Sequence, residues 1–421
     1  MKAFWLLSVF YLFVPGALLW SQANPLDLSF GINGVSTEYA TAVNSNTGTS
    51  LAIQPDGSIL ITGLTIDSPN ADFFTIRLTE GGLLDTSFNG TGKTYTDFAN
   101  TNDFPTDVAL QTDGKILVGG CAFAGPLGDF ALTRYLSNGQ YDTSFGTYGK
   151  VKMPVGLNDD RAFATVVQPD GKILMAGTAI ENGLTGFALV RYQPDGSLDT
   201  SFDNDGKVIT TLQTNVKNVQ AMVIQPDGKI LVAGDMDHLV VIRYNADGSL
   251  DYTFGSSGIV TTTVGNYYVV AYDMALQTDG KILVTGATAD PNFALVRYNP
   301  DGSLDSGFGN AGKVITSVST GDDIAYAISL QPDGQILVGG TANNRFALVK
   351  YNTNGSLDET FGNGGIVTTQ IGYSAQVYGL DFQPDGKIIA GGYAYLGTPV
   401  NLYYALARYI SNLEVGVIDF S

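Results

Sequence analysis

Seven copies of one four-residue phrase, Gln followed by Pro or Thr and then Asp-Gly, divide this chain into repeats. The copies start at Gln54, Gln111, Gln168, Gln225, Gln277, Gln331 and Gln383, with 52–57 residues between neighbours. A recurring period of about 50 residues is typical of the blades of a β-propeller. The repeat therefore predicts one closed body, although a length of 421 residues would by itself suggest two or three domains.

Each repeat holds four short apolar runs. In the copy that spans residues 258–298 these runs are 259–262, 271–277, 281–286 and 293–298. Their length and their content of Val, Ile and aromatic residues favour strands over helices. Asp279-Gly280 between two of the runs is a strong hairpin signal. We therefore expect an all-β, seven-bladed propeller of four-stranded antiparallel blades.

A second phrase, Leu-Asp-x-x-Phe-x-x-x-Gly, joins each repeat to the next. Its aspartates are Asp27, Asp85, Asp142, Asp199, Asp251, Asp305 and Asp358. We expect the Phe to fill the gap between blades, the Asp to bind turn amides and the Gly to permit the turn. In every repeat a basic residue also precedes the last residue of the fourth predicted strand. These residues are Arg77, Arg134, Arg191, Arg243, Arg297, Lys350 and Arg408. These cations are expected to tie blades together by pairing with an Asp or a carbonyl, and anion binding is the alternative.

The two ends of the repeat region are expected to pair with each other. The last predicted strand ends at Tyr409, whereas an additional strand near 35–37 precedes the first complete repeat. Pairing of these N- and C-terminal strands would complete the final blade and remove an exposed sheet edge.

The N-terminus predicts export. Residues 1–23 combine Lys2, an apolar run over 3–20 and a small-x-small cleavage site at 21–23, which is the pattern of a signal peptide. A membrane anchor is the competing interpretation, and Pro15-Gly16 disfavours it. The mature chain is then a propeller over 24–410 and a linker over 411–421, without a transmembrane segment, secreted or at the cell surface. We expect a monomer.

Charge and histidine content exclude several classes of function. A net charge of −19 excludes nucleic acid, whose binding proteins present a basic face. His238 is the single histidine, which excludes His-based catalytic triads and His-rich zinc sites. We therefore assign no catalytic residue and no resident metal, and an enzyme is the less favoured class.

The repeated phrases resemble the delta-60 repeat family of bacterial β-propellers. The phrases are Gln-Pro-Asp-Gly-Lys-Ile-Leu, Phe-Ala-Leu-Val-Arg-Tyr and Gly-Ser-Leu-Asp-x-x-Phe-Gly, and they cover nearly all of the chain after the signal peptide. The resemblance implies an exported or cell-surface propeller, and the type IX secretion route is compatible with it. It implies no activity and no catalytic residue.

Loops that differ among the copies are the expected binding surface. Because the strands are antiparallel, the loops after the first and third strands of a repeat emerge on one face, and the constant turns emerge on the other. Variable loops on a rigid scaffold commonly carry binding residues, although loops also vary where they have no function. The aromatic candidates on this face are Phe104, Tyr267, Tyr268, Tyr373, Tyr393 and Tyr395. They could stack on sugars or anchor a protein, and packing against neighbouring blades is the alternative.

Carboxylates supply two weaker candidates. Asp159, Asp160, Asp322 and Asp323 are adjacent pairs that could bind a ligand or act as acid and base, or could be solvated turn residues. A Ca²⁺ loop is the only metal pattern, with alternating oxygen ligands at Asn299, Asp301, Ser303 and Asp305. It lacks the closing Glu, and an Asx turn is the competing interpretation.

The favoured function is a non-catalytic binding scaffold that recognises an extracellular glycan or protein through the variable loops. The first alternative is a carbohydrate-active hydrolase or lyase on a propeller. The second alternative is a structural surface protein without a discrete ligand. No cofactor is expected apart from the Ca²⁺ candidate.

Overall fold

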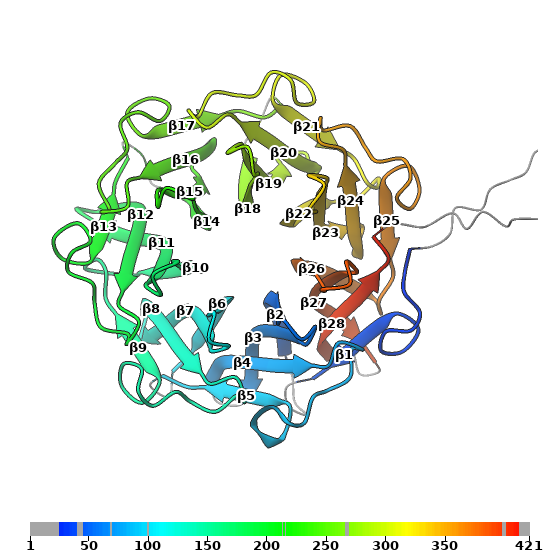
Figure 1. Ribbon diagram of the computed structural model, residues 1–421, viewed down its shortest axis with the longest axis horizontal. Helices are drawn as coiled ribbons and strands as arrows, with labels where there is room; N and C mark the ends of the chain where they lie inside the picture. Colours follow the sequence, from blue (N-terminus) through cyan, green and yellow to red (C-terminus); the bar gives the residue numbers. More distant parts are fainter. Residues whose placement is uncertain are drawn as a thin grey trace, which may run out of the picture.

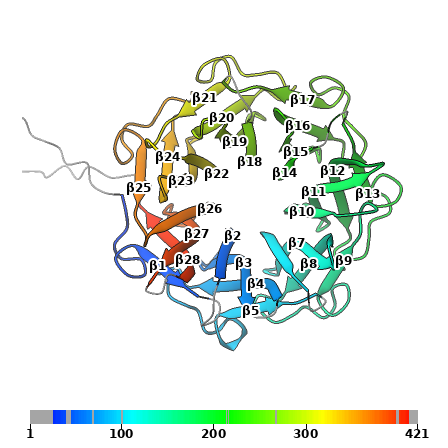
Figure 2. The ribbon, with the colours of Figure 1, turned by 180° about the vertical axis from the view of Figure 1, so that it is seen from behind.

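A computed structural model describes residues 25–411 except 40–44, 68–69, 99–100, 213, 215, 266–268 and 398–400. Seven four-stranded antiparallel sheets surround a central axis, as the sequence predicts (Figure 1). The same ring with an open centre is visible from behind (Figure 2). The predicted signal peptide lies outside the described residues, as does nearly all of the predicted linker. No helix in the described part of the chain is long and apolar enough to cross a membrane.

The first four blades follow one another along the chain. Blade 1 contains β2 (Ser45–Ile53), β3 (Ile59–Asp67), β4 (Asn70–Leu78) and β5 (Lys93–Thr96), and a short 3₁₀ turn, η1 (Phe88–Gly90), precedes β5. Blade 2 contains β6 (Asp103–Leu110), β7 (Ile116–Ala124), β8 (Leu127–Tyr135) and β9 (Lys150–Met153). Blade 3 contains β10 (Arg161–Val167), β11 (Ile173–Glu181), β12 (Leu184–Tyr192) and β13 (Lys207–Thr210). Blade 4 contains β14 (Asn218–Ile224), β15 (Ile230–Asp235), β16 (Leu239–Tyr244) and β17 (Ile259–Thr262).

The last three blades complete the ring. Blade 5 contains β18 (Val269–Leu276), β19 (Ile282–Thr288), β20 (Phe293–Tyr298) and β21 (Lys313–Thr316). Blade 6 contains β22 (Asp323–Leu330), β23 (Ile336–Ala342), β24 (Arg345–Tyr351) and β25 (Ile366–Thr369). Blade 7 contains β26 (Ser374–Phe382), β27 (Ile388–Leu396), β28 (Asn401–Tyr409) and the N-terminal β1 (Val35–Glu38).

The expected closure of the ring is confirmed. β1 pairs antiparallel with β28, with Val35 opposite Ala407 and Glu38 opposite Tyr404. The N-terminal strand therefore supplies the outermost strand of blade 7 (Figure 1). The strand that precedes each Gln-[Pro/Thr]-Asp-Gly turn is the innermost one, so β2, β6, β10, β14, β18, β22 and β26 surround the axis. The middle strands are almost wholly buried, which explains their continuous apolar runs.

The second phrase forms a latch between blades, and the boundary of blades 3 and 4 illustrates it. Arg191 donates from Nε to Asp199 Oδ2 at 2.7 Å and from Nη1 to the carbonyl of Ala246 in blade 4 at 2.5 Å. Its guanidinium lies 4.5 Å from the centroid of the Phe202 ring, which is fully buried. Gly206, the Gly of this phrase, has φ +90°, and a Cβ there would meet Leu198 Cγ at 2.5 Å. The predicted roles of the Arg, Asp, Phe and Gly are therefore confirmed.

Tyrosine hydroxyls link outer strands across several blade boundaries. Tyr298 in blade 5 is fully buried, and its hydroxyl lies 2.7 Å from Thr262 Oγ1 in blade 4. Tyr192 in blade 3 is buried to the same extent, but its hydroxyl has no hydrogen-bond partner within the described chain. The residue that would be its partner is Met153, where other blades carry Thr.

Tyr298→Phe and Tyr192→Phe are therefore expected to change stability differently. The first change leaves Thr262 without its partner and is expected to lower the free energy of unfolding by about 1–2 kcal/mol. The second removes only an unsatisfied buried hydroxyl, so it is expected to be neutral or to stabilise by up to ~1 kcal/mol. Urea unfolding of the two variants beside the parent measures the difference. Equal destabilisation by both changes would contradict this account.

Candidate functional site

The seven innermost strands surround a central channel, and each of them contains one β-bulge. In β18, for example, the pairing with β19 shifts between Ala271 and Asp273, so Tyr272 has no partner in the register. A bulge leaves one extra residue unpaired and turns its side chain. The seven residues at this position are Thr49, Thr106, Phe163, Gln220, Tyr272, Tyr326 and Tyr378. All seven line one central cavity of about 550 Å³.

Tyrosines from blades 5–7 form a continuous row on one side of this cavity. The ring centroids of Tyr272 and Tyr326 are 4.7 Å apart, and those of Tyr326 and Tyr378 are 4.4 Å apart. Tyr378 stacks on Tyr393 at 5.7 Å with an interplanar angle of 24°, and Tyr393 meets Tyr395 edge-on at 5.9 Å. We call these five residues the tyrosine row.

The tyrosine row connects the channel with the variable-loop face. Tyr272 and Tyr326 lie in the middle of innermost strands, whereas Tyr395 pairs with Ser374, the first residue of β26. β26 begins on the face that carries the variable loops and ends at the constant Asp-Gly turn. The row therefore extends from the channel interior to the mouth on the variable-loop face.

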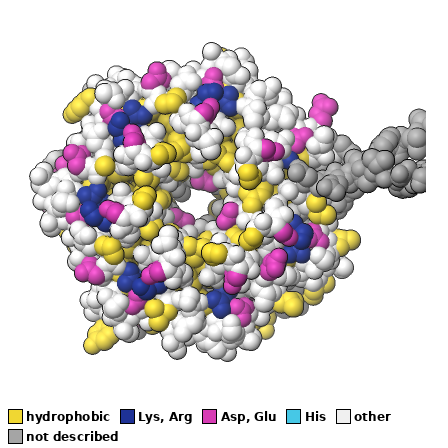
Figure 3. Space-filling view, in the orientation of Figure 1, with side chains coloured by type: hydrophobic (Ala, Val, Ile, Leu, Met, Phe, Trp, Pro, Cys, Tyr) yellow, Lys and Arg dark blue, Asp and Glu magenta, His cyan; other side chains and the backbone are white. Residues whose placement is uncertain are grey.

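The opposite wall of the cavity carries more polar groups, although Phe163 also belongs to it. It carries the hydroxyls of Thr49, Ser50 and Thr106 and the amide of Gln220. None of the described residues that line the cavity is Lys, Arg or His. Figure 3 shows the face opposite to the variable loops. Basic and acidic side chains lie side by side around the ring there, and acidic side chains lie at the central opening. An aromatic wall facing a few polar groups is a common composition for a ligand pocket.

Two carboxylates in the channel wall belong to the residue that follows the bulge. Asp107 Oδ2 accepts the amide of Thr165 in blade 3 at 2.8 Å, and its Oδ1 accepts the Ser50 hydroxyl of blade 1 at 2.8 Å. Asp273 accepts the amide of Ile328 in blade 6 at 2.8 Å. Burial raises the pKa of Asp107 to about 6 and that of Asp273 to about 7. These carboxylates tie neighbouring innermost strands together.

The predicted aromatic residues are partly assembled at this mouth. Tyr393 and Tyr395 belong to the tyrosine row. Tyr373 lies beside them with 65% of its surface exposed, and its amide donates to the Tyr395 carbonyl. Phe104 lies elsewhere, edge-on to Phe123 at 5.5 Å in a separate hollow. Tyr267 and Tyr268 lie outside the described residues.

The adjacent aspartates do not form carboxyl pairs that face one site. Asp160 is fully buried, and its Oδ2 accepts the amides of Val155 and Gly156 at 2.7 and 2.9 Å. Asp323 is equally buried and caps the amides of Val318 and Ser319 at 2.7 and 2.9 Å in the same way. Their neighbours differ, because Asp159 binds Arg161 and the Gly128 amide, whereas Asp322 is exposed. The buried member of each pair therefore holds its own loop.

The side chains of the Ca²⁺ candidate are engaged with one another and with cations. Asp301 Oδ1 accepts the amide and hydroxyl of Ser303, and the Asn299 amide donates to Ser303 Oγ. Asp305 Oδ2 is 2.9 Å from both Nε and Nη2 of Arg297. These contacts are those of an Asx turn joined to a blade latch.

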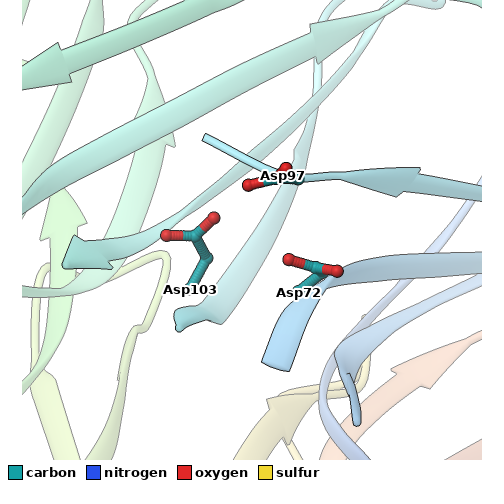
Figure 4. Close-up of side chains that lie close together, drawn as sticks. All are labelled: Asp72, Asp97 and Asp103. Atoms are coloured by element: carbon teal, nitrogen blue, oxygen red, sulfur yellow. The ribbon is translucent and has the colours of Figure 1, made fainter. Parts of the chain in front are cut away.

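A different carboxylate cluster lies between blades 1 and 2. Oxygens of Asp72, Asp97 and Asp103 lie within 4.8 Å of one another, and the three side chains converge from β4, the end of β5 and the start of β6 (Figure 4). Burial, followed by the two neighbouring carboxylates, raises the pKa of Asp103 to about 6, although the Phe98 amide opposes the shift. Oxygen ligands of this kind suit hard cations. Asp103 also caps the Phe98 amide at 2.7 Å, which is the loop-holding role of Asp160 and Asp323.

The comparisons with known proteins identify the repeat. A family described as a domain of unknown function, the DUF5122 beta-propeller, matches residues 54–88, 111–145, 168–202, 225–254, 277–308, 331–361 and 383–409. The chain belongs to this family. No curated protein matches it.

Solved structures share the propeller fold at low sequence identity. The crystal structure of Sqt1 from Chaetomium thermophilum is 11% identical, with a TM-score of 0.51 over 90% of this chain and 98% of the other. YCF48 from Cyanidioschyzon merolae is 10% identical, with a TM-score of 0.49 over 89% and 98%. A polysaccharide lyase of family PL25, an ulvan lyase, is also 10% identical, with a TM-score of 0.49 over 89% and 96%. Identities this low show the fold alone.

The channel residues were not among the predicted site residues, although the sequence contains a signal for them. Every bulge residue precedes the Gln of its own repeat by five positions, as Tyr272 does for Gln277. Alignment of the seven repeats on that Gln places three tyrosines in consecutive blades, at 272, 326 and 378. The position is thus visible in sequence, although its orientation toward the axis is not.

Proposed function

We propose that this protein is a non-catalytic scaffold that binds a glycan at the mouth of its channel. The tyrosine row is the observation that supports this proposal, because five rings in contact offer a ladder on which sugar rings can stack. The rigid blades fix the row in place, so little conformational entropy is lost on binding. A cavity of about 550 Å³ suits a glycan better than a folded protein.

The contacts of the carboxylates support a role without catalysis. A glycosidase requires two carboxyl groups that flank the scissile bond. Asp107 and Asp273 instead accept backbone amides from the next blade, and Asp160 and Asp323 hold their own loops. Among the described residues the carboxyl groups that cluster are those of Asp72, Asp97 and Asp103, which lie between blades 1 and 2 and do not line the central cavity, so the hydrolase or lyase alternative has no such pair beside the tyrosine row.

A Tyr378→Ala variant is expected to bind glycans at least about tenfold more weakly than the parent, because stacked rings contribute of order 1 kcal/mol beyond their buried area. A glycan array followed by calorimetry measures the effect. Tyr252→Ala is the matched control, since Tyr252 is 72% exposed and lies in the linker phrase on the constant face. Absence of binding to any glycan would favour the structural alternative, and equal loss in both variants would contradict the site.

The location and state of the protein are part of the same proposal. We propose a secreted or cell-surface monomer of the delta-60 type that needs no cofactor, and the signal-peptide pattern at residues 1–23 supports its export. The intact mass of the exported protein, starting at Asn24, tests the cleavage. Light scattering tests the monomer, and glycan binding in EDTA and in calcium tests the independence from Ca²⁺.

A further inference from the structure

Two acidic side chains face the central cavity from well-separated blades. Asp107 belongs to β6 of blade 2, and Asp273 belongs to β18 of blade 5, across the ring (Figure 1). The two carboxylates influence each other, since Asp107 contributes to the raised pKa of Asp273 after the larger effect of burial. Any ligand that occupies the cavity therefore lies between two like charges once both groups are ionised.

Both carboxylates keep acceptor capacity after their structural contacts. Asp273 Oδ1 accepts the amide of Met274 at 2.7 Å, and its Oδ2 accepts the amide of Ile328 at 2.8 Å. An ionised carboxylate offers about four lone-pair sites, so each oxygen of Asp273 can accept another hydrogen bond. Asp107 Oδ1 already accepts the Ser50 hydroxyl and the Val108 amide, whereas its Oδ2 accepts only the Thr165 amide and keeps one site. The carboxylate can thus hold two innermost strands together and still attract a positive group in the cavity.

The other groups in the wall add to this preference. The described lining residues include no basic side chain, and the chain as a whole carries a net charge of −19. An anionic sugar, such as a uronate or a sulfated hexose, would therefore be repelled by both carboxylates, with no cation in the described lining to offset the repulsion. The faces of Tyr272 and Tyr326 present negative π density, which attracts ammonium groups. The carboxylates and the tyrosine rings thus both favour a positively charged ligand.

We propose that the cavity is an amino-sugar subsite in which Tyr272 and Tyr326 stack on the sugar and Asp107 and Asp273 select its positive charge. This inference rests on the proposed binding of glycans at the tyrosine row and names the class of sugar. The selecting carboxylates come from two blades with Asp after the bulge, whereas the corresponding residues elsewhere are Ser50, Ala164, Ala221, Ala327 and Gly379.

Calorimetry with three hexasaccharides tests the proposal on the full mature chain. The probes are β-1,4-linked hexamers of N-trimethylated glucosamine, which is permanently cationic, and of N-acetylglucosamine, which is neutral, together with a hexamer of galacturonic acid. At about pH 8, where both carboxylates are ionised, we expect the cationic hexamer to bind at least about tenfold more tightly than the neutral one. The uronate is expected not to bind.

Substitutions separate charge selection from stacking. Asp107→Asn and Asp273→Asn are each expected to weaken binding of the cationic hexamer about 5–10-fold and to leave the neutral one unchanged. Asp381→Asn is the matched control, because Asp381 bridges to the amide of Ile53 in the next blade but does not line the cavity. It is expected to change neither affinity.

Each outcome points to one of the two proposals. If the Asn variants keep the ratio of cationic to neutral affinity, charge selection is wrong while glycan binding stands. The same conclusion follows if the uronate binds as tightly as the cationic hexamer. If no hexamer binds, the amino-sugar subsite is wrong, and only absence of binding to every glycan on the array shows that the proposed function fails as well. Circular dichroism of each variant identifies any loss that is due to misfolding.

Discussion

An Arg191→Ala variant is expected to lose roughly 3–5 kcal/mol of its free energy of unfolding, because the change removes the guanidinium partner of a buried carboxylate. The Asp199 side chain is only 2% exposed. Its lowered pKa reflects the hydrogen bonds of Ser201 and the charges of Lys172 and Arg191, which together overcome desolvation. Arg191 also holds the Ala246 carbonyl of the next blade and covers Phe202. Its loss therefore opens a boundary between blades.

Urea unfolding measures this effect, and Lys217→Ala provides the comparison. Lys217 lies 3.1 Å from Asp237, and both side chains are at least half exposed. Exposed pairs of this kind contribute about 0–1 kcal/mol, so this control is expected to change little. Lys172 lies 3.1 Å from Asp199 and compensates in part, which places Arg191→Ala toward the lower end of the range. A loss no larger than that of Lys217→Ala would show that the latch does not stabilise the ring.

The architecture could be predicted from sequence because the repeated phrases correspond to contacts between residues that are close together in the chain. Asp85 and its equivalents bind amides two residues ahead, as Asp85 Oδ1 does with the Ser87 amide at 3.0 Å. A contact of this range leaves a fixed spacing in every copy. The closing role of residues 35–37 followed from the position of the two phrases at the ends of the repeat region, and the pairing of Val35 with Ala407 confirms it.

The channel could not be predicted because it depends on bulges and on the closure of the ring. A bulge reverses the side-chain alternation at one position, so the pattern around Tyr272 does not show which way its side chain points. Contacts such as Tyr326 with Tyr378 join residues of different blades that are 52 positions apart. Such contacts arise only after the innermost strands surround the axis. Among the loop aromatics that the structure describes, Tyr393 and Tyr395 belong to the row.

The same carboxylates that line the channel predict an unusual pH dependence of stability. Burial raises the folded pKa of Asp273 to about 7, above the unfolded value of about 3.9. The folded state then binds more protons than the unfolded state between these values, so the free energy of unfolding falls as pH rises from about 4 to 7. Asp251 acts in the opposite sense, because its folded pKa is lowered to about 2 and its contribution is lost only below about pH 4. The most stable range is therefore expected near pH 4–5.

An Asp273→Asn variant isolates this effect. Near pH 4.5 the native carboxyl is protonated, and the variant is expected to be less stable than the parent by about 1 kcal/mol, because Asn offers one acceptor oxygen to the two amides of Met274 and Ile328. Between pH 4.5 and pH 8 the stability of the variant relative to the parent is expected to rise by roughly 2–3 kcal/mol, because the variant carries no buried charge, allowing for screening in an open channel. Addition of Asp107→Asn is expected to give less than the sum of the two effects, because each carboxylate disfavours ionisation of the other. Urea unfolding at both pH values measures these differences. A parent that becomes more stable from pH 5 to 7, or an Asp273→Asn variant with the parent's pH profile, would contradict the role of the channel carboxylates.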